Sequence, residues 1–456
     1  MSERTMGGRG AGLLGGGLRR CAMLGAAILS LAGCGLFESD EEILPGDRTP
    51  VRLASALPTA PADRAAQLAP LGVAQPLADW PQSNASPNRA PGHIAGPAGG
   101  AAPREAWRVD VGAGADGDRR ITSSPVVSGG RVFALDAASS VTAVDAASGG
   151  VLWRTSLSPE AEGDDDGFGG GLAVADGRVI ATTGFGDVVA LGVTDGAELW
   201  RRGLGAPLRA APAVDEERVV VVTRDNAAFA LDARDGAVRW RVLGARGGAG
   251  FLGGASPALA GGLAVLPFLS GEVVAVAAAN GRRIWADALA SGQRGLASAD
   301  ISDITGDPVI AGSAVFVANQ SGQMLALDAR TGRRGWLRPI GSVTPVWAVG
   351  ATLVAVSTEA QLVRLAAATG ETLWAVDLPR WSDPDDREGA VAYGGPVVAD
   401  GRVYLTSSEE GLLVFDAATG ERVGVAPVSG GASAGPVIAG GALYVLSDDA
   451  VLYAFR

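Results

Sequence analysis

The sequence contains no lysine, a single histidine and only two cysteines among its 456 residues. The histidine, His93, precedes the repeated part of the chain, so no Ser-His-Asp or Cys-His triad can form within the repeats. A zinc site needs histidine or cysteine ligands, and the repeats have neither. These absences exclude the common nucleophilic and zinc-dependent hydrolases. We therefore expect no catalytic residues and no metal site.

Basic residues are also scarce, because 37 of them, all arginine, stand against 49 acidic residues. The formal net charge is −12, and such a surface repels nucleic-acid phosphate. We therefore expect no nucleic-acid partner. The acidic clusters at 164–166 and 383–386 lack the spacing of an EF-hand loop, so we interpret them as solvated loop charge.

The N-terminal residues predict export and lipidation. Arginines precede an apolar run over residues 21–32 that is too short to cross a membrane as a helix, which is typical of an export signal. The run ends in the motif LAGC at residues 31–34, which resembles the bacterial lipobox. The resemblance implies a lipoprotein signal peptide over residues 1–33 and acylation of Cys34, which would anchor the chain in a membrane. Alternatively, Cys34 is an ordinary buried thiol.

Residues 34–102 form a second region, which is rich in alanine, proline and short polar residues and has no sustained period. This composition predicts a lipidated, flexible tether between membrane and domain. The stretch from Trp80 to His93 is alternatively a segment that packs against the surface of the domain. The residue after Cys34 is Gly35 and not an aspartate. In the familiar lipoprotein sorting rule, the lack of aspartate at this position favours the outer membrane.

From residue 103 the chain repeats itself. One unit reads PVVADGRVYL at 396–405 and GLLVFDAATG at 411–420, a series of short apolar strands separated by glycine turns. Four antiparallel strands in about 40–50 residues are typical of a β-propeller blade. Eight opening strands begin near Pro125, Leu172, Pro212, Pro257, Pro308, Pro345, Pro396 and Pro436. A closing tryptophan recurs at Trp153, Trp200, Trp240, Trp285, Trp336 and Trp374.

The two ends of the repeated region complete each other. The eighth unit ends at Arg456 after three strands, whereas residues 104–110 look like an unpaired fourth strand that carries Trp107. Pairing them closes the ring and removes an exposed edge. We therefore predict an all-β fold: an eight-bladed β-propeller of four-stranded antiparallel blades over residues 103–456, closed by an N-terminal strand. Each tryptophan is expected to pack between neighbouring blades.

The repeat resembles the pyrroloquinoline-quinone-type propeller repeat, which occurs in quinoprotein dehydrogenases and in non-enzymatic relatives. The dehydrogenases use polar cofactor contacts, a set of calcium ligands and commonly a vicinal disulfide. This chain has no adjacent cysteines and no lysine, and its repeats show no calcium-ligand cluster. The resemblance therefore implies the fold without a cofactor and without enzymatic activity. A quinone-dependent periplasmic dehydrogenase and a ligand-binding propeller are the alternatives.

A narrower resemblance covers essentially the whole chain. The lipobox, the tether and eight such blades are together similar to the BamB family of lipoproteins in the outer membrane β-barrel assembly machinery. The most specific segment is LASADISDITGDPV at residues 296–309. The resemblance implies a non-catalytic scaffold, lipid-anchored at the periplasmic face of the outer membrane, that aids the assembly and insertion of β-barrel proteins. Its implied partner is the barrel-inserting subunit, bound through that subunit's periplasmic domains.

The resemblance also implies which residues meet this partner. Asp303 matches the first acidic position of the family's docking loop, whereas Thr305 stands at the second. Leu252 is the counterpart of a family leucine whose neighbouring arginine is missing here, and Arg246 or Arg294 could supply that charge.

The docking loop has the composition of a protein-binding patch. Ile301 and Ile304 flank the polar Ser302 and Asp303, and apolar anchors ringed by polar groups often bind proteins. Alternatively, both isoleucines pack under the loop. The predicted partner-binding residues are Leu252, Arg294, Ile301, Ser302, Asp303 and Ile304.

Overall fold

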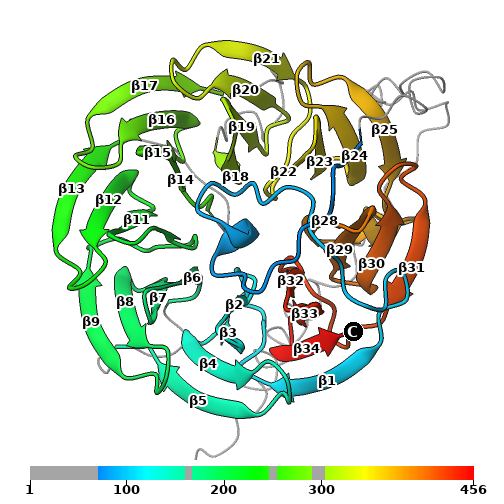
Figure 1. Cartoon of the computed structure of the whole chain (residues 1–456), viewed down its shortest axis with the longest axis horizontal. Coiled ribbons are helices and arrows are strands. Elements are labelled where there is room, and N and C mark those ends of the chain that lie inside the picture. Colours follow the sequence, from blue (N-terminus) through cyan, green and yellow to red (C-terminus); the bar gives the residue numbers. More distant parts are fainter. Residues whose placement is uncertain (1–69, 160–166, 246–253, 290–302) are drawn as a thin grey trace, which may run out of the picture. The chain divides into compact units, whose positions relative to one another are not determined.

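The structure is a computed structural model that describes residues 70–159, 167–245, 254–289 and 303–456. Eight four-stranded antiparallel sheets stand around a common centre as the blades of a propeller (Figure 1). In seven blades the strands follow chain order from the centre to the rim, and the eighth takes its outer strand from the start of the domain. The predicted eight-bladed fold is confirmed.

The strand bounds follow the predicted units. Blades 1 to 4 consist of β2 (Val126–Ser128), β3 (Arg131–Leu135), β4 (Ser140–Asp145) and β5 (Val151–Ser156); β6 (Gly170–Ala175), β7 (Arg178–Thr183), β8 (Asp187–Gly192) and β9 (Glu198–Gly203); β10 (Ala213–Val214), β11 (Arg218–Val222), β12 (Ala227–Asp232) and β13 (Val238–Leu243); and β14 (Ala258–Ala260), β15 (Leu263–Pro267), β16 (Glu272–Ala277) and β17 (Arg283–Ala288). Blades 5 to 8 consist of β18 (Ile304–Ala311), β19 (Ala314–Asn319), β20 (Met324–Asp328) and β21 (Arg334–Arg338); β22 (Trp347–Val349), β23 (Thr352–Val356), β24 (Gln361–Ala366) and β25 (Thr372–Asp377); β28 (Tyr393–Ala399), β29 (Arg402–Ser407), β30 (Gly411–Asp416) and β31 (Arg422–Ala426); and β32 (Val437–Ala439), β33 (Ala442–Leu446), β34 (Val451–Phe455) and β1 (Glu105–Asp110).

In the part of the chain that the structure describes, two small elements lie outside the blades. A hairpin of β26 (Trp381–Asp383) and β27 (Glu388–Ala390) is inserted between blades 6 and 7, and a single 3₁₀ turn, η1, spans Ser83–Ala85. Within the described ranges no helix is long and apolar enough to span a bilayer.

The position of a strand in its blade explains its sequence pattern. Inner strands such as β4 are buried at four consecutive positions, because a blade packs against a neighbour on each face. Outer strands such as β5 alternate between half-buried and exposed positions. This difference produces continuous valine-rich runs in three strands and an alternating fourth strand.

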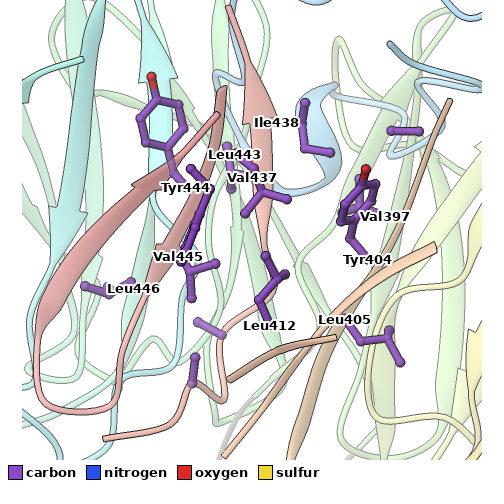
Figure 2. Close-up of a cluster of buried hydrophobic side chains, with 14 of the residues drawn as sticks. Val397, Tyr404, Leu405, Leu412, Val437, Ile438, Leu443, Tyr444, Val445 and Leu446 are labelled. Atoms are coloured by element: carbon purple, nitrogen blue, oxygen red, sulfur yellow. The ribbon is translucent and has the colours of Figure 1, made fainter. Parts of the chain in front are cut away.

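The core lies between the blades. Five clusters of buried side chains each combine two consecutive blades, from blades 1 and 2 to blades 5 and 6. A sixth and larger cluster joins blades 6, 7, 8 and 1. Figure 2 shows part of it, where Tyr404 and Leu412 of blade 7 lie with Val437 and Leu443 of blade 8.

The ring closes as predicted. β1 pairs antiparallel with β34, and Trp107 lies opposite Ala454. The pairing extends beyond the strands, because Arg104 and Arg456 exchange two backbone hydrogen bonds of 2.9 Å. The last blade therefore has four strands, and its outer strand comes from the other end of the domain.

The closing tryptophan of each of seven blades packs against the next blade, as expected, and forms a hydrogen bond to it. Each indole N–H donates to a carbonyl oxygen in the glycine-ended turn of the following blade. The seven bonds, of 2.8–3.3 Å, run from Trp107 to Ala146, Trp153 to Val193, Trp200 to Ala233, Trp240 to Ala278, Trp285 to Ala329, Trp336 to Ala367 and Trp374 to Ala417. The glycine is needed twice over: at Gly332 φ is +71°, and a Cβ would lie 2.7 Å from the Trp285 ring.

Blades 7 and 8 are not joined by such a tryptophan hydrogen bond. β31 carries Gly424 at the register position that tryptophan takes in the other blades, and blade 8 has no turn leading into its outer strand because that strand, β1, comes from the other end of the domain. The N-terminal segment fills the place, since Tyr404 Oη donates to Gly100 O over 3.1 Å. A Cβ on Gly424 would lie only 1.8 Å from Ala101 O.

Candidate functional site

The segment over residues 77–94, called the belt here, crosses the centre of the ring and visits all eight blades in order (Figure 1). Each blade donates at least one hydrogen bond to it from the first strand or the turn that follows, and blades 1 and 7 donate a second one, from Gly129 N to Asp79 and from Gly401 N to His93. The other bonds are Gly440 N to Leu77 O (2.8 Å), Val127 N to Trp80 O (2.8 Å), Val174 N to Pro81 O (2.6 Å), Val214 N to Gln82 Oε1 (3.1 Å), Leu259 N to Pro87 O (2.8 Å), Ile310 N to Asn88 O (2.9 Å), Trp347 Nε1 to Gly92 O (2.9 Å) and Asp400 N to Ile94 O (3.0 Å).

The belt satisfies the inner edges of the blades. The first strand of a blade has no partner on its central side, so its amide groups would remain unpaired there. The sequence-based boundary placed residues 34–102 in a flexible tether, with packing of the stretch from Trp80 to His93 as the alternative. The structure differs from the tether prediction from Leu77 onward and agrees with the alternative. No hydrophobic period reveals the belt, because its partners lie far away along the chain.

Two large side chains fasten the belt. Trp80 is 2% exposed and stacks on Trp347 with ring centroids 5.9 Å apart. Arg89 is fully buried and donates to Ser83 O at 2.6 Å and twice to Pro257 O, at 3.0 and 3.2 Å. Burial lowers the pKa of Arg89, and the negative charge of Asp307, 3.9 Å away, opposes that shift.

The only histidine of the chain is a packing residue of the same region. His93 Nε2 accepts a hydrogen bond from Gly401 N at 3.1 Å, so Nδ1 carries the proton and donates to Gly72 O at 2.8 Å. The ring therefore joins the N-terminal segment to blade 7 and has no free nitrogen for proton transfer.

The belt borders a central cavity of about 530 Å³, with Trp80, Ser83 and Asn84 among its lining residues. Two of its carboxylates already accept hydrogen bonds from the protein. Asp307 accepts from Ser256 N at 2.7 Å and from Ser83 Oγ at 2.9 Å. Asp448 accepts from the backbone and the hydroxyl of the nearby Ser433.

These residues do not fit the quinone and calcium pair of the dehydrogenases. In the part of the chain that the structure describes, no three side chains of histidine, cysteine, aspartate or glutamate come together as metal ligands. The carboxylates of the cavity are engaged in holding the belt and a neighbouring loop, so they are not poised to bind a cation.

The structure describes two of the predicted partner-binding residues. Ile304 begins β18, is 1% exposed and packs in the core between blades 4 and 5, as the alternative interpretation of the isoleucines has it. Asp303 is also 1% exposed. Five predicted residues lie outside the described ranges: Cys34, Leu252, Arg294, Ile301 and Ser302.

The ends of the two predicted loops nevertheless meet. Gly254, two residues after Leu252, and Asp303 line one small cavity together with Arg209, Arg224 and Leu269. Residues that are distant in sequence are thus brought to one place between blades 3, 4 and 5.

Comparison with known proteins gives one family. The sequence profile of the family "Outer membrane protein assembly factor BamB" matches residues 101–164, 137–376 and 377–456. The BamB of Yersinia pestis is 27% identical over 321 residues, which cover 68% of this chain and 80% of the relative.

Solved structures show the same fold in two kinds of protein. BamB from Moraxella catarrhalis superposes with a TM-score of 0.64 at 19% identity, covering 78% of this chain and 99% of that one. The quinohemoprotein alcohol dehydrogenase of Comamonas testosteroni also reaches 0.64, at 16% identity, covering 86% of this chain and 84% of that one. The fold is therefore common to assembly factors and enzymes, while the profile match lies with the assembly factors.

Proposed function

The chain belongs to the BamB family of outer membrane protein assembly factors, and on that premise we propose that it is a lipid-anchored scaffold that docks onto the barrel-inserting subunit. Family membership makes it an outer membrane assembly factor of the β-barrel assembly machinery, and it confirms the prediction that the chain is not an enzyme. The match of the family profile along the whole propeller carries this conclusion.

The anchor and the docking site are the finer parts of the proposal. The lipobox at residues 31–34 supports acylation of Cys34 and a position at the periplasmic face of the outer membrane. The docking site comprises the connections that hold Leu252 and Arg294 and the Ile301–Ile304 stretch. The shared cavity of Gly254 and Asp303 supports it, because one partner surface can then reach both connections.

The test of the docking site is co-purification of the barrel-inserting subunit with the full-length lipoprotein from membranes. Because Asp303 is buried, Asp303→Asn combined with Ile301→Ala is safer than a charge reversal, which could unfold blade 5. We expect at least a tenfold loss of co-purified subunit, about 1.4 kcal/mol of binding. Asp385→Asn in the exposed hairpin of β26 and β27 is the matched control and should leave binding unchanged.

Unchanged co-purification by the double variant, at normal protein level and melting temperature, would refute this docking site. Loss in the control as well would show that binding follows overall charge and not these residues.

A further inference from the structure

The central cavity contains hydrogen-bond donors that the protein leaves unused. Arg209 Nε and Nη1 are buried and have no hydrogen-bond partner, and the same holds for Asn84 Nδ2. Both residues line the cavity, Asn84 from the belt and Arg209 from the approach to blade 3. A buried donor without a partner costs free energy, so a place with several of them suits a ligand that accepts hydrogen bonds.

The charge of Arg209 is also uncompensated. Within the described ranges no carboxylate forms an ion pair with it, and its guanidinium instead lies 4.6 Å from the centre of the Phe168 ring. Burial lowers the pKa of Arg209, and repulsion from Arg224 lowers it further. An anion near this guanidinium would remove both penalties.

The carboxylates of the cavity do not supply that anion. Asp307 and Asp448 are held by the hydrogen bonds of Ser256, Ser83 and Ser433 described above. The cavity therefore has satisfied acceptors and unsatisfied donors, which is the opposite of a cation site.

Asn84 is held in place by its backbone. Its φ of 48° and ψ of 39° are left-handed, a conformation that asparagine tolerates better than most residues. The backbone carbonyl oxygen of Asn84 accepts a hydrogen bond from Ser86 Oγ at 3.3 Å. The belt thus fixes the amide at the cavity while the amide itself makes no bond through Nδ2.

We propose that this cavity binds a small ligand with a carboxylate head and an apolar body, with Arg209 and Asn84 donating to the carboxylate. The volume of about 530 Å³ lies in the usual range for small-molecule sites. Apolar side chains, among them Ile121, Leu172, Val343, Pro345 and Pro436, line part of the remaining wall, next to hydroxyl groups such as those of Thr122 and Ser124. The proposal is independent of docking to the barrel-inserting subunit.

The carboxylate could belong to a free small acid or to the C-terminus of a peptide. Calorimetric titrations of the full chain, in buffer without chloride, would compare four probes in two pairs. The first pair is 3-phenylpropionate and 3-phenylpropionamide, and the second is N-acetyl-Ala-Phe as the acid and as the amide. We expect each acid to bind at least about tenfold more tightly than its amide, because a charge-assisted hydrogen bond is lost in the amide.

Variants separate the site from unspecific binding. Arg209→Met and Asn84→Gly should each weaken acid binding about tenfold or more; glycine accepts the left-handed backbone of Asn84. The control is Arg241→Met, which removes an arginine that also stacks on a phenylalanine, 5.2 Å from the Phe229 ring, outside the cavity. Arg209→Met should melt no lower than the parent protein, since it removes unpaired buried donors.

The outcomes decide as follows. Tighter binding of the peptide acid than of phenylpropionate assigns the site to a chain terminus, and the reverse order assigns it to a free acid. Equal binding of acid and amide, no heat from either acid, or equal loss in Arg241→Met would overturn the proposal.

Discussion

The belt depends most on Arg89, and replacing this residue by methionine is the sharpest test of the role of the belt. Methionine keeps an unbranched apolar stem but removes the donors to Ser83 O and Pro257 O and the charge beside Asp307. Removing one partner of a buried ion pair costs about 3–5 kcal/mol. Part of the penalty is the loss of compensation for Asp307, which keeps its bonds from Ser83 and Ser256.

Two measurements check this magnitude. Urea unfolding followed by tryptophan fluorescence should show a loss of about 3–5 kcal/mol in Arg89→Met. Amide hydrogen exchange should show where the loss occurs, because Leu259 N and Ile310 N donate directly to the belt at Pro87 and Asn88. If the free energy needed to release the belt falls by about 3 kcal/mol, these two amides should exchange roughly 100-fold faster.

Controls separate the buried pair from a general effect of losing an arginine. Arg108→Met removes a pair with Glu105 whose arginine side chain is 62% exposed, and it should change stability by less than about 1 kcal/mol. Adding Asp307→Asn to Arg89→Met should recover part of the loss, because the uncompensated carboxylate is then gone. A loss below about 1 kcal/mol in Arg89→Met, with unchanged exchange at Leu259 and Ile310, would refute the role given to the belt.

Two further predictions concern the ring itself. Gly332→Ala should destabilise the protein by about 2 kcal/mol more than Gly312→Ala. Both glycines have positive φ, but only a Cβ at position 332 would meet the Trp285 ring. Equal urea midpoints for the two variants would contradict the packing role given to this tryptophan and glycine. Burial raises the pKa of Tyr404 and of Tyr393 to about 12, above the usual value of 10. Because the pKa of each buried tyrosine is higher in the folded than in the unfolded state, its contribution to stability is complete below pH 10 and is lost as the pH rises through 12. The urea midpoint of the parent protein should therefore fall between pH 10 and pH 12. It should fall less steeply in Tyr404→Phe and in Tyr393→Phe. A slope unchanged by both substitutions would disprove the assignment.

The sequence by itself determined the ring. Each blade repeats the same local order of strands, turns, tryptophan and glycine, so a reader of the chain can count eight units without knowing their arrangement. The strand around Trp107 could be predicted for the same reason, since it has the pattern of an outer strand and the last unit lacks one. Local patterns suffice here because each strand pairs with a sequence neighbour, except at the closure.

Only the tertiary structure decided what lies at the centre. The belt has no period, because Trp80 and Arg89 each meet partners that the ring brings from distant blades. The burial of Ile304 could not be told from the sequence either, since an isoleucine at the start of a strand has the same pattern whether it faces a partner or the next blade. Whether a charged residue is compensated, as Asp307 is and Arg209 is not, depends on groups that folding places within a few ångströms. Spacing along the chain carries no record of those distances.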